Sequence, residues 1–218
     1  MPTKLHNLPL AGYIMNSYPS KLLDDAIAEL VKLPGVGRRT ALRLALWILK
    51  QDPIRAEALG RAIISLRTEI NYCKECHNVA DGEICNICAD HKRDHSIICV
   101  VEDIRDVIAI ENTNQFSGVY HILDGVISPM DGIGPQDINI DSLIQKAESG
   151  NVKELIMALP STTEGDTTAF YIYRKVQSSI PVISAISRGI AIGDDLEYAD
   201  EVTLGKSIRN RVPFDKSL

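Results

Sequence analysis

The stretch CKECHNVADGEICNIC, residues 73–88, decides how this chain folds, because it contains two Cys-x-x-Cys pairs separated by eight residues. Each pair can place two thiolates on one side of a tight turn, and two facing turns supply the four soft ligands that structural zinc prefers. These ligands are Cys73, Cys76, Cys85 and Cys88. Four thiolates leave no open coordination position, so we expect one structural zinc ion per chain. Two disulfides, or four free thiols that cluster by chance, are the alternatives, and both are less typical of such pairs in a cytosolic chain.

Length and composition set the class of protein. The 218 residues suit one large domain or two smaller ones, and 45% hydrophobic residues provide for a core. No run approaches the roughly 18 to 20 apolar residues that a membrane span needs, and no basic region followed by an apolar core directs secretion. We therefore expect a cytoplasmic protein with no membrane partner. The fifth cysteine, Cys99, lies in the apolar run Ile97–Val101 and is expected to be a buried strand residue, not a nucleophile.

Charge is distributed unevenly along the chain, whose net charge is −6. The segment from Leu30 to Gln51 contains no acidic residue, and its cations are Lys32, Arg38, Arg39, Arg43 and Lys50. Acidic residues gather near the C-terminus at Asp194, Asp195, Glu197, Asp200 and Glu201. Such a chain can present a basic face to phosphate and an acidic face to a protein partner. Two ordinary solvated surfaces are the alternative.

The basic segment has the pattern of two helices joined by a tight turn. Ser20 can cap a first helix, whose apolar residues recur at helical spacing up to Val31, and a second helix runs to about Gln51. Between them, Leu33–Gly37 reads Leu-Pro-Gly-Val-Gly, which leaves backbone N–H groups exposed at the start of the second helix. Unpaired amides and the helix dipole both favour an anion there. The segment resembles a helix-hairpin-helix, which binds the nucleic-acid backbone with little sequence preference, whereas a plain helix connection is the alternative.

The remainder of the chain alternates apolar runs with helical patterns from Ser96 onward. The expected strands are Ile97–Val101, Val119–Leu123, Leu155–Leu159 and Val182–Ala185, and the expected helices are Arg105–Asn114, Ser142–Ser149, Thr167–Val176 and Gly205–Arg209. Near-continuous apolar strands between helices indicate a parallel sheet covered on both faces. Functional groups in such sheets gather just past the carboxyl ends of the strands.

Glu102 follows the first of these strands and resembles the leading glutamate of a Toprim domain. Toprim enzymes pair that glutamate with an Asp-x-Asp at a later strand end to hold magnesium, whereas the corresponding stretch here, residues 159–166, contains no Asp-x-Asp. Glu164 and Asp166 are expected to begin the next helix, where acidic side chains offset the dipole. We expect a non-catalytic Toprim remnant. A magnesium-dependent Toprim nuclease or phosphotransferase is the alternative, and magnesium would need more oxygen ligands than these.

Taken together, these modules resemble the RecR family of bacterial recombination mediators. The motifs that carry the resemblance are Leu33–Gly37, the four cysteines, Cys99–Asp103, Gly125–Pro135 and Gly193–Leu204. The resemblance implies a homotetrameric ring that clamps single- or double-stranded DNA in the nucleoid and works with RecO, and in many bacteria RecF, to load RecA. Its DNA contacts would come from the five cations of the basic segment. Two features depart from the family: residues 1–14 extend before its usual start, and Pro160-Ser161 stands where many relatives carry Asn-Pro.

The expected architecture is therefore an α/β chain of several modules. These are an N-terminal extension (1–19), a helix-hairpin-helix domain (20–71), a four-cysteine zinc finger (72–95), a Toprim domain (96–192) and a C-terminal Walker B-like assembly segment and tail (193–218). We expect His77 to be a surface residue and not a fifth zinc ligand, His91 and His95 to be solvated, and His121 to be packed in a strand. A protein-only adaptor, whose helical hairpin mediates assembly without DNA, is a further alternative.

Overall fold

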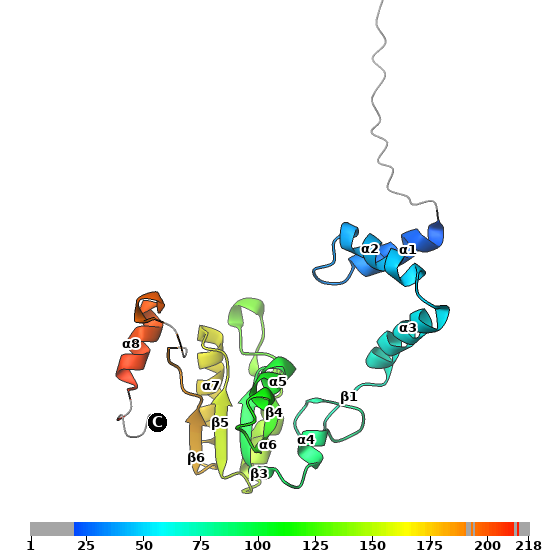
Figure 1. Cartoon of the computed structure of the whole chain (residues 1–218). Coiled ribbons are helices and arrows are strands. Elements are labelled where there is room, and N and C mark those ends of the chain that lie inside the picture. Colours follow the sequence, from blue (N-terminus) through cyan, green and yellow to red (C-terminus); the bar gives the residue numbers. More distant parts are fainter. Residues whose placement is uncertain (1–19, 191–192, 194, 212, 214–218) are drawn as a thin grey trace, which may run out of the picture. The chain divides into compact units, whose positions relative to one another are not determined.

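The computed structural model describes residues 20–190, 193, 195–211 and 213, and the chain divides into two compact units after Thr68 (Figure 1). The extension expected at residues 1–19 lies outside the described residues, as do Asp194 and the last residues of the tail. None of the helices in the described part combines the length and the apolar character that crossing a bilayer requires. The two units are taken in turn.

The first unit consists of three helices. They are α1 (Lys21–Val31), α2 (Arg38–Leu49) and α3 (Pro53–Thr68). Helices α1 and α2 pack through buried Ile27, Ala41 and Ala45, and the two small alanines let the helices approach closely. Ser20 occupies the position before α1, as predicted, but its side chain makes no capping hydrogen bond.

The second unit begins with a small module that contains the four cysteines. Its elements are the antiparallel strands β1 (Asn71–Tyr72) and β2 (Val79–Ala80) and the short helix α4 (Asn86–Ala89). The buried residues of the hydrophobic cluster in this module are Cys73, Cys76 and Cys85, together with Ala80. Two-residue strands and a four-residue helix cannot bury much apolar surface, so the thiols themselves make up most of the core.

A four-stranded sheet follows, with the order β4-β3-β5-β6 and every neighbouring pair parallel (Figure 1). The strands are β3 (Asp94–Val101), β4 (Gly118–Ile122), β5 (Glu154–Ala158) and β6 (Val182–Ala185). The helices are α5 (Ile104–Asn112), α6 (Ile140–Glu148), α7 (Thr163–Val176) and α8 (Glu201–Arg209), with 3-10 turns η1 (Pro129–Asp131), η2 (Pro135–Asp137) and η3 (Leu196–Tyr198). The predicted parallel sheet is confirmed, because each predicted strand overlaps an observed one.

The two faces of the sheet are covered unequally. One face carries the main core, in which Val100 and Leu155 pack with Leu143 of α6 and Ile172 of α7. The other face packs Val101, Tyr120 and Val107 of α5 over β3 and β4. Toward the edge strand this second cover stops, because Val182 of β6 is half exposed. The prediction of a sheet covered on both faces therefore holds for the centre of the sheet and not for its β6 edge.

Candidate metal centre and nucleic-acid interface

The four cysteines of the small module converge on one point. Their sulfur atoms all lie within 4.8 Å of one another, three of the residues are buried and Cys88 is partly buried. The Sγ atoms of Cys76 and Cys85 are 3.5 Å apart, and none of the cysteines in the described residues forms a disulfide. Tetrahedral zinc with bonds of about 2.3 Å places its sulfur ligands roughly 3.8 Å apart. The donor set and its spacing therefore fit a structural zinc ion.

Backbone hydrogen bonds build the two turns that present these thiols. In the first turn, Cys73 N donates to Asn78 O at 2.7 Å and His77 N donates to Cys73 O at 2.9 Å. In the second, Cys85 occupies the N-cap of α4, and its Sγ accepts from Cys88 N at 3.5 Å. An amide that points at the sulfur favours the thiolate, as metal ligands require.

Without an ion the clustered thiols compete for protons. The pKa of Cys76 is lowered to about 6, mainly by a hydrogen bond from Cys88, whereas burial raises the pKa of Cys85 to about 11. Four thiolates this close repel one another, so a divalent cation is the natural compensating charge.

The cysteine module is anchored to the sheet through the residues beside Cys76. Ile122 N at the end of β4 donates to Cys76 O at 2.9 Å, and His77 Nε2 lies 2.9 Å from Ser142 Oγ of α6. The His77 ring also meets the ring of His121 edge to face, with centroids 5.1 Å apart. His77 is therefore only partly exposed, because its side chain joins two modules. The prediction that it is not a fifth ligand agrees with a metal-binding group that contains the four cysteines and not this histidine.

The other histidines mostly follow expectation. His121 is fully buried, its Nε2 lies 2.7 Å from Asn139 O, and burial lowers its pKa to about 3, so the ring is neutral. His91 and His95 are exposed as predicted, although His95 lies within β3. Cys99 is buried in β3, and burial raises its pKa to about 12, which makes it a packing residue.

In the helical unit, a tight turn that contains two glycines leads into α2. Gly35 has a φ of +77°, a backbone conformation that residues other than glycine rarely adopt. Val36 N donates to Leu33 O at 3.1 Å, and Gly37 is the N-cap residue from whose carbonyl the helix begins. No atom lies within 4 Å of where a Cβ on Gly37 would be, so nothing crowds the backbone on that side of the turn. The N–H groups of a first helical turn have no partner within their helix and favour an anion.

The five predicted DNA-binding cations separate into two groups. Arg39, Arg43 and Lys50 line one groove along α2, together with Leu42, Leu46 and Trp47. Arg38 instead lies 4.0 Å from Asp24 of α1, and Lys32 pairs with Glu29 at 2.7 Å. The sequence identified the cations, but it did not indicate that an apolar strip with the protein's single tryptophan lies among three of them.

At the carboxyl end of β3, Glu102 is held among other acids. Its pKa is raised by burial and then by repulsion from Asp106 and Asp103. Asp103 caps α5, and Asp106 accepts a hydrogen bond from the Asp103 N–H, which completes a capping box. These two carboxylates are therefore occupied in starting a helix.

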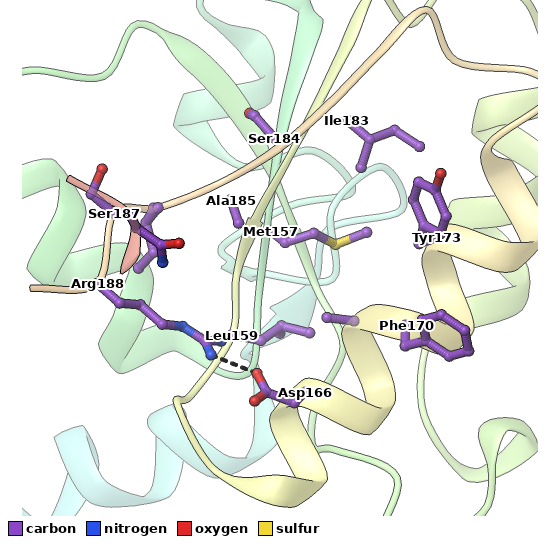
Figure 2. A pocket seen from close by; sticks show the side chains of 13 residues that line it. Met157, Leu159, Asp166, Phe170, Tyr173, Ile183, Ser184, Ala185, Ser187 and Arg188 are labelled. Atoms are coloured by element: carbon purple, nitrogen blue, oxygen red, sulfur yellow. Dashed lines mark ion pairs between the residues drawn. The ribbon is translucent and has the colours of Figure 1, made fainter. Parts of the chain in front are cut away.

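The later strand end does not add ligands to Glu102. Thr162 caps α7 through its side chain, and Glu164 and Asp166 lie in the first turn of that helix, as predicted. Asp166 pairs with Arg188 at 2.6 Å, and Figure 2 marks this ion pair with a dashed line. Across the described ranges, the four cysteines form the only group of three or more metal-binding side chains within reach of one ion.

A groove lies beside this ion pair, along α7 and β6. Its volume is about 620 Å³, and apolar side chains such as Met157, Phe170 and Ile183 line it (Figure 2). Phe170 is 63% exposed, and Tyr173 and Ile186 are nearly half exposed. The groove therefore offers apolar surface, with one neutralised ion pair at its end, and resembles an interaction surface more than a catalytic pocket.

Comparison with known proteins accounts for nearly all of this architecture. The chain matches four family models: the RecR helix-hairpin-helix (residues 23–66), the RecR four-cysteine zinc finger domain (70–90), the Toprim domain (96–185) and the RecR C-terminal model (189–212). It is 58% identical over 198 residues to a protein of Parabacteroides distasonis, covering 91% of this chain and 95% of that one. It is 55% identical over 205 residues to one of Porphyromonas gingivalis, covering 94% and 99%. Both relatives bear the name "Recombination protein RecR".

Proposed function

This chain belongs to the RecR family, and from that premise we propose that it is a DNA-binding recombination mediator that clamps DNA as a ring during recombinational repair. In this role it helps RecO, and RecF where present, to load RecA onto single-stranded DNA at the nucleoid in the cytoplasm. The observation that carries the proposal is the basic groove on α2, which directly follows the glycine turn of the helix-hairpin-helix.

The groove suits backbone recognition. Arg39 and Arg43 are one helical turn apart, so both can reach phosphates that flank an anion at the helix start. Contacts of this kind carry no sequence information and weaken with salt. Arg38 and Lys32, which already have acidic neighbours, contribute at the margin of the same surface.

Zinc has a structural part in this proposal. Cys73, Cys76, Cys85 and Cys88 would hold one ion per chain, and that ion would supply no chemistry because its coordination shell is full. It fixes the first turn, and the hydrogen bond from Ile122 N to Cys76 O carries that order to the end of β4.

Each unit has an apolar surface that another copy can cover, which is what closing a ring requires. On the helical unit the exposed apolar side chains include Leu22, Leu49, Ile54, Ile63, Ile64 and Leu66. On the second unit they line the groove of α7 and β6 and continue at Leu196, Tyr198, Val202 and Ile208. We place the domain limits at 20–71, 72–95, 96–192 and 193–218. With these limits, the first and the last domain each carry exposed apolar side chains.

The clamp is proposed to be non-enzymatic. Glu102 has no Asp-x-Asp partner, and Asp166 is neutralised by Arg188. Magnesium requires several oxygen ligands in octahedral array, which one partly buried carboxylate does not supply. The competing function is a magnesium-dependent Toprim nuclease or phosphotransferase that uses Glu102.

One pair of gels separates these functions. Labelled gapped duplex is incubated with zinc-loaded protein and magnesium, then run under native and denaturing conditions. We expect an intact substrate that is shifted by the protein, with the shift lost when Arg39 and Arg43 are both replaced by Glu and retained when Arg55 and Arg67 of α3 are replaced. Strand cleavage that disappears in Glu102→Gln would overturn the non-enzymatic clamp. No shift even at low salt would leave a protein-only adaptor.

A further inference from the structure

We propose that Trp47 is a stacking platform for an unpaired base, so that the groove on α2 binds single-stranded DNA in preference to duplex. This inference rests on the proposed DNA binding and adds to it a substrate class and a residue. Trp47 is the protein's only tryptophan, and its side chain lies in the groove with 57% of its surface exposed.

The order of side chains along α2 suits a single strand. Arg39, Arg43 and Trp47 follow one another at intervals of four residues, so they share one face of the helix. At 1.5 Å per residue, Arg43 lies roughly 6 Å and Trp47 roughly 12 Å along the axis from Arg39. Lys50, just beyond the end of the helix, closes the far side of the groove. Two cations precede the indole and one follows it, so a DNA strand whose phosphates contact these cations passes beside the ring.

The chemistry of the groove is that of a single-strand site. Proteins that bind single strands combine cations for the phosphates with aromatic side chains on which bases stack. Leu42 and Leu46 provide an apolar floor next to the indole, which also favours a base over water. The bases of a duplex are already stacked on one another, so only an unpaired base can use the ring.

Charge in the groove is uncompensated. Among the residues that the structure describes, no carboxylate lies within ion-pair distance of Arg39, Arg43 or Lys50, and none lines the groove. A second copy of the chain, docked through the same face about a two-fold axis, would set these cations against their own equivalents. A polyanion is therefore the better partner for this face.

The single tryptophan makes the inference directly measurable. Zinc-loaded full-length protein is titrated with oligo(dT) and, separately, with blunt duplex of the same length, while Trp47 emission and the anisotropy of a labelled DNA are both followed. Stacking is expected to quench the emission strongly with oligo(dT) and weakly with duplex. Emission that stays constant while anisotropy reports binding of the single strand would overturn the inference and leave DNA binding intact.

Variants then separate stacking from packing. Trp47→Leu should lower affinity for oligo(dT) by about 5- to 150-fold, the range measured for loss of one stacked base, and should change duplex affinity by less than about twofold. Trp47→Phe keeps an aromatic face and should restore most of the loss. Equal losses on single strand and duplex, or no rescue by Phe, would contradict a stacking role. Circular dichroism and zinc content establish that each variant is folded.

The remaining outcomes are also decisive. Failure of the wild-type protein to bind either DNA at low salt would remove the proposed function and the inference with it. An emission change that follows protein concentration in the absence of DNA would assign the ring to a contact between copies and overturn the inference alone. Ile108→Ser, which removes an exposed apolar side chain of α5 outside both proposed assembly surfaces, serves as the matched control and should leave the preference for single strands unchanged.

Discussion

The Nε2 atom of His77 lies 2.9 Å from the Oγ of Ser142, although the two residues are 65 positions apart in the chain. This contact joins the turn that carries Cys73 and Cys76 to the helix α6 beneath the sheet. His77 has a φ of +63°, a conformation that is uncommon outside glycine, so the side chain is held in place by the contacts that it makes. The cysteine module and the sheet are therefore expected to respond together when the metal is removed.

Zinc removal should destabilise more than the module itself. We expect one zinc per chain, and we expect chelation to lower the melting temperature and to increase hydrogen exchange at the end of β4, because Ile122 N donates to Cys76 O. Cys76→Ser should lose the metal, as measured by elemental analysis. Cys99→Ala is the control, because Cys99 lies in the sheet and outside the cluster: it should lose some stability and keep its zinc. Full zinc content in Cys76→Ser would contradict the assigned ligands.

DNA affinity should depend on salt through the arginines of α2. Replacing Arg39 and Arg43 with Gln removes two phosphate contacts, which should reduce the slope of log affinity against log salt by about 1.4 on single strands and about 1.8 on duplex. Fluorescence anisotropy over a range of potassium chloride measures the slope. The same change at Arg55 and Arg67, exposed cations of α3, removes equal charge and should leave the slope as it is. A wild-type slope in the variant that lacks Arg39 and Arg43 would mean that the DNA phosphates bind elsewhere on the protein.

The ion pair between Arg93 and Glu111 should contribute to stability above acidic pH. Arg93 donates to Glu111 at 2.9 Å, and Tyr120 OH donates to the same carboxylate at 2.7 Å. Hydrogen bonding from Arg93 lowers the pKa of Glu111 below its usual value. The lowered pKa means that the stabilisation is fully present above the unfolded value of about 4.3 and is lost as the pH falls through the folded value.

Glu111→Gln should therefore lower the free energy of unfolding by about 1 to 3 kcal/mol at pH 7. Urea denaturation should show this difference shrinking as the pH falls below about 4.3, because the carboxyl of the unfolded chain takes up a proton first and that of the folded protein only at lower pH. Glu57→Gln, which removes a well-exposed pair with Arg61, should cost no more than about 1 kcal/mol. A difference between Glu111→Gln and the wild type that does not vary with pH would contradict the role of the charge.

Gly165 is expected to be irreplaceable even by alanine. A Cβ at this position would lie 2.1 Å from the carbonyl oxygen of Pro160, which is backbone and cannot move aside easily. Gly165→Ala should lower the free energy of unfolding by about 2 kcal/mol or more. At Gly205 of α8, no atom lies within 4 Å of where a Cβ would be. Gly205→Ala should therefore leave the free energy of unfolding unchanged or raise it by up to about 1 kcal/mol. Equal thermal stability of the two variants would contradict this close approach.

Sequence patterns located the parallel strands because runs such as Ile97–Val101 are buried on both faces, and burial leaves a continuous apolar signal. The sequence patterns did not predict α3. The apolar residues of this helix are spread around it and largely exposed, so they form no periodic stripe in the sequence. Four cysteines could be assigned to one site because metal geometry restricts their spacing.

Contacts between residues far apart in the chain leave no comparable pattern in the sequence. The role of His77 depends on Ser142 and His121, which reach it only when the chain is folded. Trp47 was not distinguished from other apolar residues of its helix, although its position four residues after Arg43 could have marked it as part of the basic face. Whether an apolar residue of this helix packs in the core or lies in the basic groove depends on its burial, and burial is known only once the unit is folded.

The ion pair between Asp166 and Arg188 also bears on how such a fold changes over evolutionary time. Asp166, in the first turn of α7, holds the segment that follows β6 in place. A relative in which this acid came to bind a metal ion would have to release it from Arg188 and also find another anchor for that segment, and neither change alone would be an advantage. Two changes that succeed only together are rare, so the ion pair helps to keep this acid in a structural role.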